Sequence, residues 1–161
     1  MAGKKKKNAQ ESGKLVIDVN KKARRDYEIT EMFEAGISLL GSEVKSVRAS
    51  GVSLRDSYVR VKDNECMLVG CHIGPYEFAR QDSHEPYRDR KLLLHRREIS
   101  RLFEAIKQKG LTVVPLRIYF NKAGKCKLEI GLGRGKKLFD KREDIKTRDA
   151  KRQIERALKS R

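Results

Sequence analysis

Apolar and polar residues alternate in short runs along residues 14–133, a pattern typical of β-strands. Residues 14–19, with the sequence KLVIDV, alternate enough to form a short strand. Residues 27–40 form a longer run, in which Ile29, Phe33 and Ile37 lie among polar positions. Gly36 within this run predicts a bulge or a sharp bend, which would let one long strand turn the corner of a barrel.

Two hairpins are predicted further along the chain. Residues 53–73 place apolar side chains on two arms, with Asp63 and Asn64 at the turn between them. Residues 111–133 form a second hairpin around Ala123 and Gly124. Residues 74–90, between the hairpins, are a long polar connection that contains two prolines.

Three helices flank these strands. Asn20 can cap a single helical turn, and Ser42 can cap a short helix over residues 41–50 that has Glu43 in its first turn. A longer helix runs to Gly110, which stops it. Its apolar residues follow the i, i+3, i+4, i+7 spacing of an amphipathic helix: Ile99, Leu102, Phe103 and Ile106. Short antiparallel strands with one longer helix predict a mainly β fold, an antiparallel barrel of about six strands with two to three helices.

Positive charge is concentrated at the two ends of the chain. The formal net charge of the 161 residues is +17, and residues 134–161 carry twelve Lys and Arg against five Asp and Glu. Residues 1–13 are polar and rich in Lys, which predicts disorder. We therefore expect a disordered basic N-terminus over residues 1–13, a β-barrel domain over residues 14–133 and a basic tail over residues 134–161.

The tail has few apolar residues but retains a helical pattern. Four of them fall at i, i+4, i+7 and i+8: Ala150, Ile154, Ala157 and Leu158. A helix of this kind is marginal by itself in water. The pattern predicts a segment that is disordered when free and becomes helical against a partner.

A charge of this size indicates a polyanionic partner. An anionic membrane is a weaker candidate, because the chain has no Trp and no run of 18 apolar residues. The basic N-terminus is followed by polar residues, so it does not resemble a secretory signal. Cys66, Cys71 and Cys126 form no CxxC pair, which predicts free thiols in the cytoplasm and no zinc site.

Patterns that would indicate catalysis are weak. The chain has no GxSxG motif, and GLGRGKK (residues 131–137) lacks the spacing and the Ser or Thr of a phosphate-binding loop. Glu28, Glu31 and Glu34 are clustered acids that could hold Mg²⁺ in a nuclease. In a strand, however, Glu31 faces away from the other two, which argues against a tight metal site. We therefore expect no cofactor and no resident metal.

Basic residues lie next to aromatic residues in two places. Arg24 and Arg25 precede Tyr27, and Lys136 and Lys137 precede Phe139. Arg and Lys neutralise phosphates, while aromatic rings stack on unpaired bases, so both places are candidate RNA contacts. Each ring has a structural alternative that stays open: a half-buried position in the core for Tyr27, and closure of the last strand of the barrel for the ring at position 139.

Several stretches, in order, resemble one family. GSEVKSVRASGVSLRDSYVRV (residues 41–61) is similar to its central signature. Four further blocks match on either side: NKKARRDYEI (20–29), FEAGISLLG (33–41), RKLLL (90–94) and GKKLFDKREDIK (135–146). Together they resemble the SmpB family, whose members bind transfer-messenger RNA in bacterial trans-translation. The resemblance covers residues 14–146, most of the chain.

The resemblance implies a barrel of the oligonucleotide-binding type with a flexible C-terminal tail. It also implies a monomeric, cytoplasmic, non-enzymatic factor that grips the tRNA-like domain of transfer-messenger RNA. Protein and RNA would enter the A site of a stalled ribosome, with the tail in the empty mRNA channel beside the decoding centre. The implied RNA-binding residues are Asn20, Arg24, Tyr27, Glu34, Arg90, Lys91 and Leu93. The implied ribosome-binding residues of the tail are Lys136, Lys137, Phe139, Asp140, Lys141, Arg142 and Ile145.

Position 139 departs from the family pattern, because many members have His or Tyr there and this chain has Phe. A phenyl ring can stack on a base but cannot form a hydrogen bond. Two alternatives to the implied function stay open from the residues themselves. One is a general ribosomal or single-strand RNA-binding protein on the same barrel, and the other is the metal-dependent nuclease using Glu28, Glu31 and Glu34.

Overall fold

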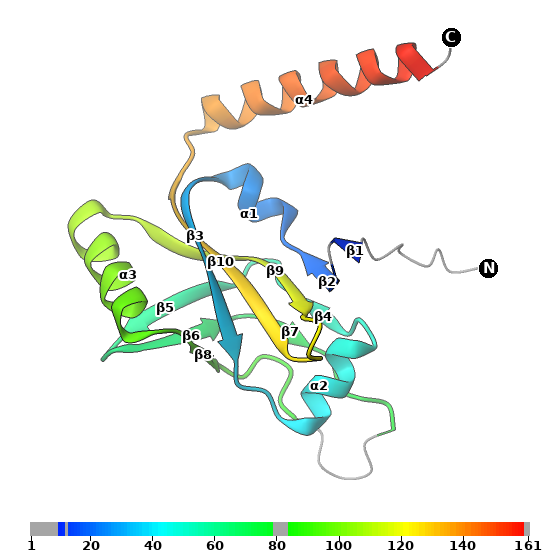
Figure 1. Ribbon diagram of the computed structural model, residues 1–161. Coiled ribbons are helices and arrows are strands. Elements are labelled where there is room, and N and C mark those ends of the chain that lie inside the picture. The colour runs from blue at the N-terminus through cyan, green and yellow to red at the C-terminus, as the bar shows by residue number, and fades with distance from the viewer. Residues whose placement is uncertain (1–9, 12, 79–83, 160–161) are drawn as a thin grey trace.

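The computed structural model describes residues 10–11, 13–78 and 84–159 (Figure 1). In chain order its elements are β1 (Gln10–Glu11), β2 (Lys14–Val19), α1 (Lys21–Asp26), β3 (Tyr27–Ile37), α2 (Gly41–Arg48), β4 (Val52–Ser53), β5 (Tyr58–Lys62), β6 (Glu65–Val69), β7 (His72–Ile73), β8 (Arg90–Leu93), α3 (Arg96–Lys109), β9 (Thr112–Phe120), β10 (Cys126–Gly135) and α4 (Leu138–Lys159). The predicted disorder of residues 1–13 falls mostly outside the described residues. Within that segment, Gln10 and Glu11 pair with β2.

Eight of the strands form one antiparallel sheet in the order β1-β2-β9-β10-β3-β8-β6-β5. A further pairing of Val59 with Val113 joins β5 to β9, so the sheet closes on itself. This closure confirms the predicted mainly β fold, an antiparallel barrel flanked by helices. Beyond the six predicted strands, the structure has β8 and three strands of two residues each, which are too short to leave a periodic pattern in the sequence.

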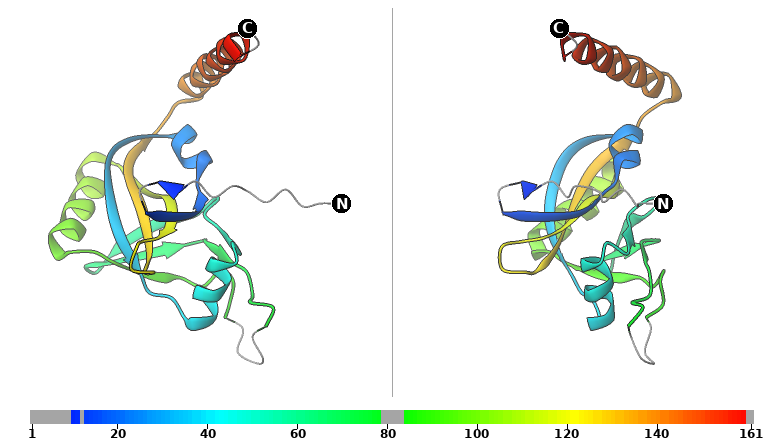
Figure 2. Two further views of the ribbon diagram at one scale, coloured as in Figure 1. Left: turned by 45° about the vertical axis from the view of Figure 1, so that its right-hand side comes forward. Right: turned by 90° about the vertical axis from the view of Figure 1, so that its right-hand side faces the viewer.

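Strand β3 is the longest strand and curves around the barrel (Figure 2). It pairs with β10 over most of its length, and Gly36 and Ile37 at its end pair with β8. A side chain at position 36 would begin 3.1 Å from the Cβ atom of Leu93. The glycine therefore allows β8 to approach β3 closely at the position where the sequence predicted a bulge or bend.

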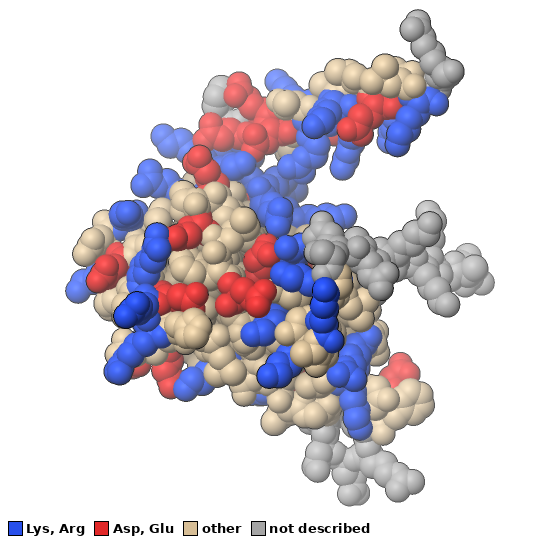
Figure 3. Space-filling model, in the orientation of Figure 1, with Lys and Arg blue, Asp and Glu red and all other residues tan. Residues whose placement is uncertain are grey.

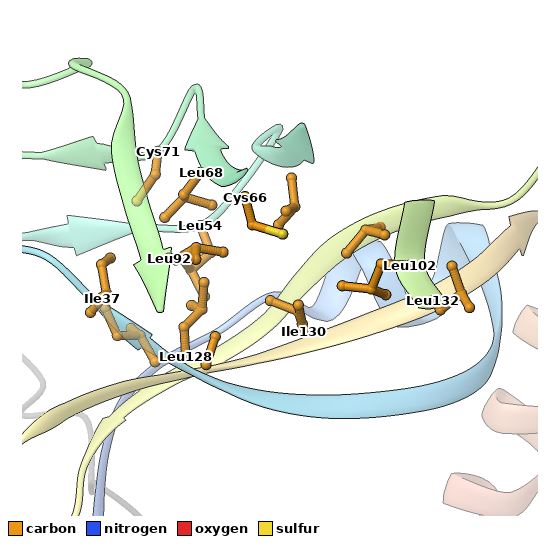
Figure 4. Close-up of a cluster of buried hydrophobic side chains, with 14 of the residues drawn as sticks. Ile37, Leu54, Cys66, Leu68, Cys71, Leu92, Leu102, Leu128, Ile130 and Leu132 are labelled. Carbon is orange, nitrogen blue, oxygen red and sulfur yellow. The ribbon is translucent and has the colours of Figure 1, made fainter. Parts of the chain in front are cut away.

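The barrel encloses one main core, shown in Figure 4. Its fully buried side chains come from strands on all sides and from α3, and include Leu54, Leu68, Leu102, Leu128 and Ile130. All three cysteines are free thiols, and two of them lie in this core. Burial raises the pKa of Cys66 to about 11 and, together with nearby acids, that of Cys71 to about 12, so both remain protonated at neutral pH.

Both predicted hairpins and the long helix are present. Asp63 and Asn64 both have positive φ, the geometry that a two-residue hairpin turn requires, and they join β5 to β6. Gly110 ends α3 in the left-handed conformation. The predicted cap of α2 was wrong. The capping position is Leu40, whose backbone N–H donates to Glu43, while the hydroxyl of Ser42 hydrogen-bonds His84.

The C-terminal helix α4 extends away from the barrel (Figures 1 and 2). Strand β10 continues to Gly135, two residues beyond the predicted end of the barrel, and the backbone N–H of Lys136 donates to Asp26 at 2.8 Å. Lys141 lies 3.8 Å from the same aspartate, so the start of α4 is tethered to α1. The structure shows the helical form of the tail, and its disorder in the free protein stays a prediction.

Candidate nucleic-acid interface

The outer face of the sheet carries a connected set of charged side chains. Strand pairing places Glu129 of β10 beside Glu34 of β3 on one side and beside Arg117 of β9 on the other. Two acids next to each other on a sheet repel unless cations compensate them. The cations come from three elements: Lys14 of β2, Arg24 of α1 and Arg117 of β9. Figure 3 shows this mixture, with acidic side chains in the middle of the barrel face and basic side chains around them.

Glu34 accepts a hydrogen bond from the hydroxyl of Tyr119 through its Oε2 atom. The ammonium of Lys14 lies 3.5 Å from the same oxygen. The hydrogen bond from Tyr119 is the main reason why the pKa of Glu34 is lowered, and Lys14 and Lys127 lower it further against the opposing effect of burial. Glu34 is therefore an ionised, half-exposed acceptor, with 49% of its side chain accessible.

Glu34 also lines a surface groove with two of the other residues implied in RNA binding. We call it the β8 groove; its lining includes Glu34, Lys91, Leu93, His95 and Lys127. Leu93 is 56% exposed, an unusual position for a leucine on a strand. Lys91 is exposed and pairs with Glu65. The groove thus combines an anionic acceptor, an apolar contact and two lysines.

Arg24 and Tyr27 line a second groove at the other end of β3. We call it the α1 groove; its lining includes Arg24, Tyr27, Glu28, Met32 and Lys136. Arg24 reaches Glu129 at 3.5 Å and keeps 52% of its side chain exposed. Tyr27 packs partly against Ala23, so the half-buried alternative describes its position. Tyr27 remains partly exposed and lines the groove.

Asn20 does not face the surface. Its amide donates to the carbonyls of Leu54 at 3.0 Å and Pro115 at 3.1 Å, and its side-chain oxygen accepts from the N–H of Ala23 at 3.0 Å. The side chain therefore caps α1, as the sequence predicted, and joins that helix to two other segments of the barrel. Its polar groups are occupied within the protein.

Arg90 is fully buried. Its guanidinium donates to Glu43 at 2.8 Å and to the carbonyls of Cys71, Arg88 and Pro86. Burial by itself would raise the pKa of Glu43, but hydrogen bonds from Arg88, the backbone of Leu40 and Arg90 together lower it. This group of ion pairs ties α2 to the connection before β8. Arg90 therefore supports the strand that carries Lys91 and Leu93.

Glu31 of β3 is separated from Glu34, as the strand spacing indicated. Glu31 points toward α3 and pairs with Arg101 at 2.6 Å, while Glu34 is held by Tyr119 on the opposite face. Across the described residues, no group of three or more His, Cys, Asp or Glu side chains could hold a metal ion.

The glycine-rich run before the tail belongs to a strand rather than to a loop. At Gly133 an added Cβ atom would lie 2.4 Å from the carbonyl oxygen of Glu28. Glycine is required there because β3 and β10 approach closely at a register shift between Leu132 and Gly133. The run GLGRGKK therefore has a packing role, and the backbone geometry is not that of a phosphate loop.

The implied tail residues lie at the junction with the barrel and along the first turns of α4. Lys136 pairs with Asp144, and Lys141 reaches Asp26. Lys137, Asp140 and Arg142 are exposed, and the side chain of Phe139 lies outside what the structure describes. Two pairs of apolar residues are exposed along the helix, Leu138 and Ile145 on one face and Ile154 and Leu158 on the opposite face.

The sequence did not single out Tyr119, Arg117 or Glu129, which organise the charged face. Tyr119 is 1% exposed, within a strand whose sequence is almost entirely apolar. A signal was present, because Arg117 and Tyr119 are two residues apart and so share one face of the strand. Their partners, however, come from β3 and β10, and only the strand register identifies them.

Comparisons with known proteins agree with this architecture. Residues 17–160 match the family model described as SmpB protein. A protein of Symbiobacterium thermophilum named SsrA-binding protein is 55% identical over 142 residues, covering 88% of this chain and 90% of that protein. A protein of the same name from Acetivibrio thermocellus is 57% identical over 146 residues, covering 91% and 94%.

A solved structure described as "tmRNA-SmpB: a journey to the center of the bacterial ribosome" contains a similar chain. That chain has a TM-score of 0.65 and 47% sequence identity, with 83% of this chain and 95% of that chain covered. None of the helices in the described segments is both long and apolar enough to cross a membrane. With the family match over nearly the whole chain and relatives more than half identical, this chain belongs to the SmpB family.

Proposed function

We propose that this chain binds the tRNA-like domain of transfer-messenger RNA and accompanies it to the A site of stalled ribosomes. The observation that carries the proposal is family membership across residues 17–160, together with relatives named SsrA-binding protein that align over about nine-tenths of both chains. The similar chain from the transfer-messenger RNA–SmpB ribosome structure supports the same partners. The basic surface supplies the general attraction to RNA.

The RNA contacts of the barrel lie along the two grooves on either end of β3. In the α1 groove, the guanidinium of Arg24 neutralises a phosphate and the ring of Tyr27 stacks on a base. Glu34, Lys91 and Leu93 serve the β8 groove. Asn20 and Arg90 act indirectly, since their side chains are buried and hold α1 and β8 in place.

The tail detects whether the mRNA channel of the ribosome is empty. Lys136, Lys137, Lys141 and Arg142 are attracted to the RNA walls of an empty mRNA channel, and Asp140 lies in the first turn of α4, where it suits the helix dipole. Ile145 and the other exposed apolar residues of α4 pack against the channel, and Phe139 stacks on a base of the decoding centre. An mRNA in the channel excludes the helix, so the tail discriminates by occupancy rather than by sequence.

The role is non-catalytic. Of the three acids that suggested a nuclease, Glu31 and Glu34 point to opposite faces of β3, where Arg101 engages Glu31 and both Tyr119 and Lys14 engage Glu34. Prolonged incubation of RNA with the protein and Mg²⁺ should leave the RNA intact. Cleavage that requires Glu31 or Glu34 would restore the nuclease alternative.

The experiment that tests the proposed function compares RNA partners at one ionic strength. The dissociation constant is measured for transfer-messenger RNA, for an ordinary tRNA and for an unstructured RNA of equal length. Transfer-messenger RNA should bind most tightly. Equal affinity for all three RNAs would instead support a general RNA-binding protein, because charge attraction alone does not distinguish their shapes.

A further inference from the structure

Tyr119 occupies a central position on the outer face of the sheet. Strand β10 lies between β9, which carries Tyr119, and β3, which carries Glu34. The register places Lys127 opposite Tyr119 and Glu129 opposite Glu34. The Tyr119 side chain therefore reaches diagonally across β10 to bring its hydroxyl to the carboxylate of Glu34.

The ring of Tyr119 is held firmly, while its hydroxyl remains directed at one partner. The residue is 1% exposed. Two cations lie over the ring, the ammonium of Lys14 at 4.6 Å from its centroid and the guanidinium of Arg117 at 5.8 Å. A buried ring with cations over it has little freedom to turn, so the position of its hydroxyl is well defined.

The contacts continue from Tyr119 to the other groove. Arg117 pairs with Glu129 at 2.9 Å, and Glu129 also reaches Arg24 at 3.5 Å. One chain of contacts thus runs from Glu34 through Tyr119, Arg117 and Glu129 to Arg24. It connects two residues proposed to contact RNA that lie at opposite ends of β3.

Only one oxygen of Glu34 is used in these contacts. Tyr119 and Lys14 both approach Oε2, and within the described part of the chain nothing hydrogen-bonds Oε1. Half of the side chain is exposed, and it lines the β8 groove with Leu93, Lys91 and Lys127. A carboxylate oxygen cannot contact a phosphate favourably but can accept a hydrogen bond from the amino group of a base.

We infer that Tyr119 is a positioning residue for RNA recognition, which fixes Glu34 so that its free oxygen accepts from the exocyclic amino group of an unpaired base. The base lies against Leu93, and the two lysines contact its flanking phosphates. This arrangement favours a base that presents an amino group to the groove over one that presents only carbonyl oxygens. The inference rests on the proposed function and identifies the kind of nucleotide that the β8 groove takes.

The lowered pKa of Glu34 supports this geometry, since the hydrogen bond from Tyr119 is its largest cause. The charged and titratable groups that face Glu34 are Lys14 from β2, Tyr119 from β9 and Lys127 from β10, with Glu129 beside it. His95, Glu65, Glu98 and Lys91 also line the groove, so the pH dependence is compared between the wild type and Tyr119→Phe, which differ only in the hydroxyl that faces Glu34.

The test uses the full-length protein and a double-mutant cycle. Tyr119→Phe removes the hydroxyl and keeps the ring, and Glu34→Ala removes the acceptor. Tyr119→Phe should weaken binding of the tRNA-like RNA by about three- to tenfold, with little change for unstructured RNA. In the Glu34→Ala background the same substitution should have no further effect, because Tyr119 acts only through Glu34.

Two further measurements separate positioning from packing. In Tyr119→Phe the pKa of Glu34 rises, so the loss of affinity on acidification should begin at a higher pH than in the wild type. Tyr58→Phe is the matched control, since the hydroxyl of Tyr58 has no hydrogen-bond partner among the described residues and its loss should leave affinity unchanged.

The inference is overturned if Tyr119→Phe binds like the wild type, or if it is equally harmful when Glu34 is Ala. The second result would indicate a packing role for the ring and hydroxyl. A wild-type chain that does not prefer the tRNA-like RNA would contradict the proposed function itself, and this inference with it. The two failures are therefore distinguishable in one set of measurements.

Discussion

At the scale of single residues, Asn20 and Arg90 show how a buried polar side chain holds neighbouring segments of the barrel together. Each makes at least three hydrogen bonds to backbone or side-chain atoms inside the barrel. Removing such a side chain leaves buried carbonyls or a carboxylate without donors, which costs more than the bond itself contributed. We therefore expect substitutions there to reduce the free energy of unfolding first and RNA affinity second.

Asn20→Ala should lower the free energy of unfolding by about 2–3 kcal/mol, because the helix cap and two donors to buried carbonyls are lost. Urea denaturation measures the change. Asn20→Ser is the matched variant, since it keeps a capping oxygen and loses the amide donors, and its effect should be intermediate. A variant as stable as the wild type that nonetheless binds RNA poorly would show that Asn20 contacts RNA directly.

Arg90→Met should lower the free energy of unfolding by about 3–5 kcal/mol, since it removes one cation of a buried ion pair and the donor to three backbone carbonyls. Arg88 still reaches Glu43, so the variant should fold and remain measurable by urea denaturation. Lys91→Met, at the neighbouring exposed position, is the control and should change the free energy of unfolding little. Equal stability of the two variants would contradict a supporting role for Arg90.

The same cluster predicts a dependence on pH. The pKa of Glu43 in the folded protein lies below its ordinary value of 4.5, so its ionisation stabilises the fold above that value. This contribution should be lost as the pH falls from 4.5 through the lower pKa of the folded state. Urea denaturation across pH 3–7 should show the decline. Glu43→Gln, although less stable at neutral pH, should show a smaller decline, and an unchanged pH dependence would exclude Glu43 as its source.

At the scale of elements, α4 differs from the other helices in having an apolar stripe without a partner. Ile154 and Leu158, which lie on this stripe, are both more than 60% exposed. The stripe of α3 instead packs on the barrel through Ile99 and Leu102, which are buried. A helix receives most of its stability from packing such a face. The apolar face of α4 is therefore available to pack against a partner.

Removing residues 138–161 should leave the barrel folded, because β10 ends at Gly135 and the backbone bond from Lys136 to Asp26 is retained. Affinity for transfer-messenger RNA should stay within about tenfold, while tagging of stalled chains on ribosomes should be abolished, because phosphate contacts of the barrel remain. Binding assays and a reconstituted tagging reaction measure the two properties. Loss of RNA binding on truncation would show that the two parts do not act separately.

Ala150→Pro tests the helix separately from its charge. It keeps the charge of the tail and makes the free energy of helix formation in the middle of α4 less favourable by about 3 kcal/mol. If helix formation in the channel matters, this variant should fail in tagging as the truncated chain does. Ala150→Ser is its control. Full tagging activity with proline would indicate that charge alone is sufficient.

At the scale of the whole molecule, the net charge of +17 is spread over both ends and the barrel, with the acids of the outer face compensated one by one. Such a surface attracts any RNA, so selectivity requires contacts beyond charge, which we propose that the two grooves supply. Logarithmic affinity should therefore fall linearly with the logarithm of salt concentration. Arg24→Ala should reduce that slope by about one if Arg24 contacts a phosphate.

Arg97→Ala is the matched control for this measurement, since Arg97 is exposed on α3 and lines neither groove. Titrations at four salt concentrations with each variant would give the slopes. Equal slopes for Arg24→Ala and the wild type would contradict the phosphate contact and leave Arg24 only its ion pair with Glu129.

Local patterns in the sequence determined the six longer strands, the hairpin turn at Asp63 and Asn64, the cap at Asn20 and the ordered motifs of the family. Periodicity and turn chemistry act over a few residues, which is why they can be recognised in the sequence. The tertiary structure alone decided which polar residues are buried and which meet. Tyr119 and Glu34 are 85 residues apart, and their contact depends on the register of three strands. The partner of a polar side chain is set by the pairing of distant strands, which no local pattern encodes.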